Sequence, residues 1–82
     1  MQVRTKALEG AAVRWDGANA DELAALAGNS YEGTYASDAL VRNRDGDLVH
    51  VRPGWVVVVW GGAGEADVYS AGAWRAQVER VP

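Results

Sequence analysis

The sequence contains no cysteine and a single histidine, His50. These absences exclude disulfide bonds and thiolate metal sites, and a structural zinc site would need nearly all of its ligands from carboxylates. We therefore expect neither a metal ion nor a cofactor. Because 82 residues form only one small core, which leaves about 3–5 kcal/mol of net stability, oligomerisation is one of the few remaining ways to stabilise the fold.

A basic surplus and a long apolar run are also missing. Asp and Glu outnumber Lys and Arg by 11 to 8, which argues against duplex DNA or RNA as the main partner, because phosphate binding normally needs excess positive charge. The longest continuous apolar run, residues 55–60, is far shorter than the roughly 20 residues of a membrane-spanning helix. No apolar segment follows Met1 as it would in a signal peptide. We expect one intracellular domain, residues 1–82, that makes no contact with a membrane.

One segment, residues 20–27, has the signals of an α-helix. Asn19 precedes it and Glu22 follows three residues later, which is the pattern of a capping box, and Gly28 supplies a C-terminal stop. Its apolar side chains recur at helical spacing and form one narrow face, made of Leu23, Leu26 and Ala27. Two helical turns are not stable alone, so this face must pack on a sheet.

The rest of the chain is predicted as short strands joined by tight turns. We expect extended segments at 3–8 and 11–15 with a turn or bulge at Gly10, a surface loop or irregular edge strand at 29–38, and an antiparallel meander over 39–69. A short helical turn capped by Ser70 and a last strand at 78–81 follow. These elements predict an α+β fold, a twisted antiparallel β-sheet of about five strands with one short α-helix on one face.

The hairpin over residues 39–52 gathers basic side chains. A three-residue loop ending at Gly46 pairs Asn43 with Asp47 and Val41 with Val49. This register places Arg42, His50 and Arg52 on one face together with Leu40 and Leu48, and a second set on the other face: Ala39, Val41, Val49 and Val51. The basic face is either solvated or an anion site, because arginine binds phosphate with paired donors and a nearby aromatic ring can stack on a base.

The segment 55–60 is apolar on both faces. In a regular strand Val56, Val58 and Trp60 lie on one face, and Trp55, Val57 and Val59 on the other. The short helix covers only one of them, and a bare second face would promote aggregation. We therefore expect a second copy of the chain to cover it, with Trp60, Val57 and Val59 at the interface. Which of the two tryptophans is buried stays open.

Two further features suggest a phosphate-binding loop and a catalytic base, but each lacks the neighbouring residues that such a site needs. The glycine cluster at 61–64 has no following lysine and no following helix, so it is predicted as a hairpin loop and not as a phosphate-binding loop. His50 has no serine or cysteine nucleophile motif beside it. We therefore expect a protein that is not an enzyme.

Several short motifs occur in a defined order along the chain. Trp15, Gly17 and Asn19 form an aromatic-x-Gly-x-Asn turn before the acidic helix start, and a Pro-Gly-Trp-Val-Val segment at 53–57 and a Gly-Glu pair at 64–65 come later. In this order they resemble a widespread group of small phage accessory proteins, common in phages of actinobacteria and mostly without assigned function. The chain departs from the group's pattern where an aspartate is absent after Gly54, and where Trp74 and Val78 replace Phe and Tyr.

The resemblance implies a small non-enzymatic phage protein that acts in phage–host conflict in the host cytoplasm. In one mode, a homo-oligomer sequesters a cyclic or ADP-ribose-type nucleotide used in immune signalling. Arg42, Arg52 and His50 would contact its phosphates, and Trp55 or Tyr35 would stack on its base. In a second mode the chain docks on a host protein through Trp60 or Trp55 and holds no small ligand. In a third, enzymatic mode, His50 acts as the base on a nucleotide phosphodiester.

Overall fold

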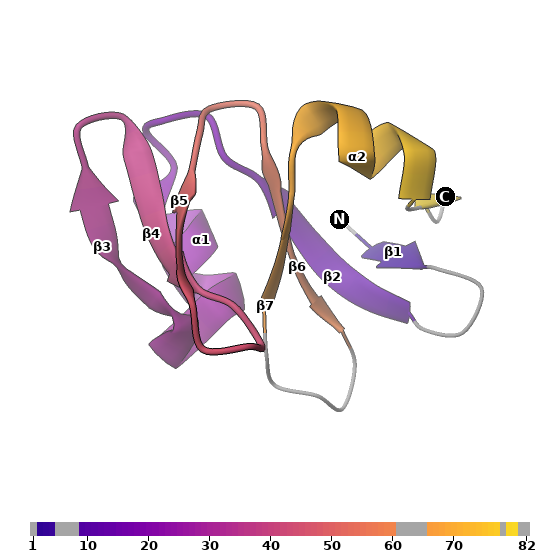
Figure 1. Cartoon of the computed structure of the whole chain (residues 1–82), viewed down its shortest axis with the longest axis horizontal. Helices are drawn as coiled ribbons and strands as arrows, with labels where there is room; N and C mark the ends of the chain where they lie inside the picture. Colours follow the sequence, from indigo (N-terminus) through magenta and orange to yellow (C-terminus); the bar gives the residue numbers. More distant parts are fainter. Residues whose placement is uncertain (1, 5–8, 61–65, 78, 81–82) are drawn as a thin grey trace.

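The computed structural model describes residues 2–4, 9–60, 66–77 and 79–80, and the side chains of residues 10–60 and 66–74. These residues form an α+β fold (Figure 1). The elements follow one another along the chain as β1 (Gln2–Arg4), β2 (Glu9–Arg14), α1 (Ala20–Ala27), the 3-10 turn η1 (Gly28–Ser30), β3 (Tyr31–Tyr35), β4 (Asp38–Arg42), β5 (Leu48–Val51), β6 (Val56–Trp60), β7 (Ala66–Tyr69), α2 (Ala71–Gln77) and β8 (Glu79–Arg80).

The strands form two sheets, where we expected one. The larger sheet has the order β7-β6-β2-β1-β8, and the smaller has the order β3-β4-β5. Neighbouring strands within each sheet are antiparallel, and a parallel bridge between Asn43 and Ala66 joins the two sheets. The predicted fold class, antiparallel β-structure with a short helix packed on one face, is confirmed, but within the described residues eight strands in two sheets replace the expected five.

The division into two sheets originates at the turn after β5. Gly54, whose φ is 94°, donates its N–H to the carbonyl of Trp15 over 2.6 Å, and the N–H of Trp15 donates to the carbonyl of Trp55 over 2.8 Å. These two bonds align β6 with β2, so that Val13 pairs with Val57. The predicted meander is therefore interrupted, because β6 pairs with β2 and not with β5.

Strand β6 is buried on both faces, and its side chains alternate as predicted. On one face Val57 lies in what we call the first cluster, against which Trp55 and Val59 also pack; its other members are Val13, Trp15, Leu23, Ala27, Ala39, Val41, Val51 and Ala66. The other face contributes Val56, Val58 and Trp60 to the second cluster, with Ala12 of β2 and Trp74 of α2. In Figure 1 the two helices lie on either side of the β6–β2 pair.

The second face of β6 is covered within a single chain. Val56 and Val58 are fully buried and Trp60 is 2% exposed, with Trp74 packed in the same cluster. The expectation that a second copy covers this face is wrong, because α2 supplies the cover. The predicted interface residues are correspondingly internal: Val57 and Trp60 lie in the core, and Val59 packs half-buried against the first cluster. The apolar face of β6 therefore no longer supports the prediction of a homo-oligomer.

Gly10 lies inside β2, and not at a turn between two strands. A Cβ atom at this position would lie 2.6 Å from the carbonyl oxygen of Val59 and 2.9 Å from Cε3 of Trp60. Only glycine therefore lets β2 approach β6 at this point without displacing the backbone of the partner strand.

Helix α1 has the predicted boundaries, and Leu23 and Ala27 are buried against the sheets. The predicted capping box is wrong in detail, because Asn19 makes no side-chain hydrogen bond to the helix backbone. Its Oδ1 accepts the N–H of Asp16 over 2.9 Å, while Nδ2 donates to the carbonyl of Arg14 over 2.9 Å and to Oε1 of Glu22 over 2.8 Å. Asn19 thus fastens the helix start to the end of β2.

The remaining elements follow the predictions closely. Residues 29–38 contain β3, an edge strand whose register shifts between Tyr31 and Gly33. Helix α2 is longer than the predicted turn, and Ser70 caps it as expected, with Oγ accepting the N–H of Ala73 over 3.3 Å. Strand β8 pairs with β1. The glycine cluster at 61–64 and Val78 lie outside the described residues.

Candidate functional site

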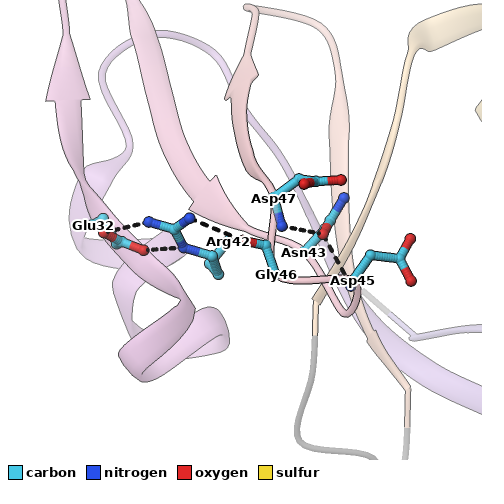
Figure 2. A network of polar contacts seen from close by, with 6 residues as sticks. All are labelled: Glu32, Arg42, Asn43, Asp45, Gly46 and Asp47. Atoms are coloured by element: carbon cyan, nitrogen blue, oxygen red, sulfur yellow. Dashed lines mark hydrogen bonds and ion pairs between the residues drawn. The ribbon is translucent and has the colours of Figure 1, made fainter.

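The β4–β5 hairpin has the predicted register. Val41 pairs with Val49 and Leu40 with His50, and the N–H of Asn43 donates to the carbonyl of Asp47 over 2.9 Å. Gly46 adopts a left-handed φ of 89°. The side-chain oxygen of Asn43 accepts the N–H groups of Asp45 and Asp47 over 3.0 and 2.9 Å, which holds the loop in one shape (Figure 2).

The outer face of the small sheet is the side opposite its buried residues, and it carries Tyr35, Asp38, Leu40, Arg42, Leu48 and His50. Arg42 does not project freely from it. Its Nε lies 2.7 Å from Oε2 of Glu32, its Nη2 donates to Oε1 over 3.3 Å, and its Nη1 donates to the carbonyl of Gly46 over 2.9 Å (Figure 2). The hydrogen bond from Arg42 lowers the pKa of Glu32 and, in return, raises the pKa of Arg42. The charge of Arg42 is therefore already matched by a carboxylate.

The other outer-face candidates also have neighbours within the sheet. His50 Nδ1 lies 3.7 Å from Oδ2 of Asp38, and the ring of Tyr35 meets His50 edge-on at 6.4 Å. Tyr35 is 70% exposed. Arg52 is exposed just beyond β5, and within the described part of the chain it forms no ion pair.

Trp55 is the candidate that the structure separates from this group. It precedes β6, is half-buried and packs against the first cluster. The predicted nucleotide site is thus brought together only in part, because Tyr35, Arg42 and His50 share the outer face while Trp55 lies elsewhere. The predicted docking anchor Trp60 is buried, and its Nε1 donates to Oδ2 of Asp67 over 2.8 Å.

Trp55 lines a pocket of about 370 Å³, which we call the Trp55 pocket. The pocket lies where the β4–β5 loop meets β7, next to the parallel bridge between the sheets. Its apolar and aromatic lining consists of Val49, Trp55, Val68 and Tyr69, and its polar lining consists of Asn43, Arg44, Asp45 and Asp67. Arg44 and Asp45 are exposed, so the pocket opens to solvent at the loop.

An ion pair forms one wall of the Trp55 pocket. Arg44 donates from Nε to Oδ1 of Asp67 over 2.9 Å and from Nη2 to Oδ2 over 2.6 Å. Since Asp67 also accepts the indole N–H of Trp60, its carboxylate is held from two sides. This arrangement ties the hairpin loop to β7 and to the second cluster.

The aromatic wall is held by packing. Tyr69 meets Trp74 edge-on at 6.3 Å and packs against the second cluster. Burial raises the pKa of the Tyr69 hydroxyl, and the negative charge of Asp67 raises it further. Tyr69 is therefore a neutral phenol at physiological pH.

Sequence reasoning found Trp55, but it did not place Arg44, Asp67 or Tyr69 beside it. Asp67 and Tyr69 alternate with Val68 on β7, which is a usable signal for one shared face. No local signal joins Arg44 to Asp67, because they are separated by 23 positions and meet only through the bridge between the sheets.

Two properties of the described residues concern metal binding and membrane insertion. Among the described residues no group of three His, Asp or Glu side chains is placed to hold a metal ion. In the same part of the chain, no helix has the length and apolar character needed to cross a membrane.

Comparison of the chain with protein-family models, curated proteins and solved structures gave no match. The resemblance to small phage accessory proteins therefore stays a prediction from the motifs.

Proposed function

We propose that this chain is a non-enzymatic binding protein whose ligand occupies the Trp55 pocket. The observation that carries the proposal is the pocket itself, in which two aromatic side chains and three charged ones converge on about 370 Å³. This volume is at the lower end of the roughly 300–1,000 Å³ that is typical of small-ligand sites, and such sites combine apolar walls with a few placed polar groups.

The composition of the lining supports binding over catalysis. Among the described residues the pocket is lined by no serine, cysteine, histidine or lysine. His50, the one candidate base, belongs to the outer face of the small sheet beside Asp38. Tyr69 is held neutral by the raised pKa described above. The described lining therefore contains no serine or cysteine nucleophile paired with a histidine or lysine base.

A protein that binds without reacting can act by sequestration or by occupying its target, and the phage–host setting implied by the sequence motifs suits both. A nucleotide is the ligand that the sequence predicted for the sequestration mode. Its predicted phosphate site on the outer face has little support, because Arg42 is paired with Glu32. The Trp55 pocket offers the ring of Trp55 to a ligand of either charge, and its one described cation, Arg44, is paired with Asp67.

Nuclear magnetic resonance tests the pocket directly. The four tryptophan indole N–H signals can be followed while cyclic dinucleotides, ADP-ribose and neutral and cationic fragments are added. We expect shifts of the Trp55 indole and of the amides of Arg44 and Asp45, and a loss of the amide shifts in Trp55→Leu. The matched control Tyr35→Ala, on the outer face, should bind as the wild type does. If every compound leaves the Trp55 pocket unperturbed, the proposal is wrong.

A second candidate function, docking on a host protein, is favoured by exposed apolar side chains on the outer face. Tyr35 is 70% exposed and Leu48 is 40% exposed, whereas Trp60 is buried and unavailable as the anchor. A photo-crosslinking residue at position 35 should trap one defined host protein, and the same residue at the exposed helix position Ala25 should not. Equal labelling from both positions would contradict docking through this face.

A further inference from the structure

The charges on the Trp55 pocket do not balance. Arg44 is turned onto Asp67 with two hydrogen bonds of 2.9 and 2.6 Å, so these two opposite charges offset each other. Asp45 is left over: it is exposed, and within the described part of the chain its carboxylate has no hydrogen bond or ion pair. Figure 2 shows Asp45 on the side of the loop away from Arg42 and Glu32. The pocket therefore carries one uncompensated negative charge.

The aromatic rings that line the pocket favour a cation, as the charge of Asp45 does. The faces of tryptophan and tyrosine rings carry negative electrostatic potential and attract cations within about 6 Å, most strongly for tryptophan. Trp55 is half-buried, so a cation beside it loses part of its competing water. A carboxylate next to such rings is a combination suited to ammonium and guanidinium groups.

The electrostatic field around the pocket has local and distant sources. At Tyr69, burial raises the pKa, the charge of Asp67 raises it further and the charge of Arg44 lowers it, so both members of the ion pair act on the phenol. The whole chain has a net charge of -3, which attracts cations and repels anions at long range.

The same features of the pocket disfavour an anion. Arg44 is the one cation in the described lining, and its Nε and Nη2 already donate to Asp67. A phosphate bound to Arg44 would share its charge with Asp67 and would lie beside two carboxylates. Repulsion between the phosphate and these carboxylates would raise the free energy of the complex.

We propose that the Trp55 pocket binds a guanidinium or ammonium group on an alkyl chain, held between the ring of Trp55 and the carboxylate of Asp45. This inference rests on the proposed function, which places the ligand in the Trp55 pocket, and adds the chemical class of that ligand. The same chemistry is found in arginine and lysine side chains of a partner protein and in free polyamines.

The test compares four ligands with the intact chain by nuclear magnetic resonance titration. N-acetylarginine methylamide and spermidine represent the two sources of the cation, N-acetylcitrulline methylamide is the neutral counterpart of the arginine compound, and ADP-ribose is the anion. We expect the cations to shift the Trp55 indole and the Asp45 amide, with affinity that falls as salt is added. The citrulline compound should bind at least fivefold more weakly than the arginine compound.

Two neighbouring aspartates provide a matched pair of variants. Asp45→Asn should weaken cation binding about two- to fivefold, the range of one exposed ion pair, whereas Asp47→Asn should leave the affinity unchanged. Asp47 is exposed on the same loop but does not line the pocket. Both positions are exposed, so neither substitution perturbs the core.

The outcomes separate the inference from the proposed function. Binding of either cation with the expected Asp45 dependence supports the inference, and the cation that binds identifies the source. Equal binding of the arginine and citrulline compounds, or tighter binding of ADP-ribose in the pocket, overturns the inference while the binding function stands. If none of the four compounds perturbs the pocket, the inference is overturned, and the broader panel described above then decides the binding function.

Discussion

The two hydrophobic clusters on either side of β6 are built in different ways. The first combines residues of α1, of both sheets and of the loop before the helix, whereas the second joins β2 and β6 to Trp74 of α2. Among the described side chains of α2, Trp74 is the buried one. One face of β6 is therefore secured by many independent contacts, and the other depends strongly on one aromatic ring.

The largest effect is expected from removing that ring. Trp74→Ala should lower the free energy of unfolding by about 3–5 kcal/mol, because a buried tryptophan leaves a large cavity. It should also uncover Val56, Val58 and Trp60, so that the protein self-associates. Urea denaturation measures the first effect, and size-exclusion chromatography with light scattering measures the second.

A substitution in the first cluster provides the comparison. Leu23→Ala should also destabilise the chain, by about 2–5 kcal/mol, but it leaves the cover of the second face in place and should not cause self-association. Because Trp74→Ala can unfold a domain of this size, Trp74→Leu serves as the milder variant. Hydrogen exchange shows whether the Val56 and Val58 amides become accessible to solvent in Trp74→Leu. If they do and the variant still has the oligomeric state of the wild type, exposure of this face does not cause self-association.

A smaller effect is expected at the contact between β2 and the second cluster. Gly10→Ala should lower the free energy of unfolding by about 1–3 kcal/mol, because the new methyl group meets the backbone oxygen of Val59 and the ring of Trp60. Gly72→Ala is the matched control, since a Cβ there has no neighbour within 4 Å and the site is helical. It should raise stability by about 0.5–1 kcal/mol. A Gly10→Ala variant as stable as Gly72→Ala would show that β2 and β6 can separate without cost.

The smallest effect is expected outside both clusters, at the exposed Arg42–Glu32 pair. The pKa of Glu32 is lowered from its ordinary 4.5, so the ionised form contributes stability above that pH, and the contribution is lost as the pH falls through the lowered value. The urea midpoint of Glu32→Gln should lie slightly below that of the wild type at neutral pH and coincide with it in strong acid. A gap that persists or widens in acid would mean that Glu32 acts through packing and not through its charge.

Local patterns were sufficient for the elements whose determinants lie close together in the sequence. Helix α1 begins and ends as predicted because an acidic first turn and Gly28 mark its ends, and the β4–β5 register follows from a loop that needs a left-handed residue at Gly46. The alternation of residues 55–60 was predicted for the same reason. The geometry of Asn19 was not, because its side chain bonds to the end of β2 in preference to the helix backbone.

The Trp55 pocket shows why the candidate site was predicted only in part. Trp55 was selected as an aromatic of the central strand, and the basic residues were selected from the hairpin register. Their separation arises from the turn at Gly54, which turns β6 toward β2 and leaves Trp55 facing the β4–β5 loop and β7. Arg44 and Asp67 then meet across a bridge that involves residues far apart in the chain.

The sequence by itself determined the helix at 20–27, the hairpin register, the alternation of side chains along β6 and the need to cover β6 on both sides, because these properties depend on periodicities and turn residues a few positions apart. The tertiary structure decided what covers each side and where charges meet. Trp74 replaced the expected second chain, and the pairing of Arg44 with Asp67 left Asp45 unmatched. These outcomes depend on contacts between distant residues, which form only when the chain packs and desolvates them together.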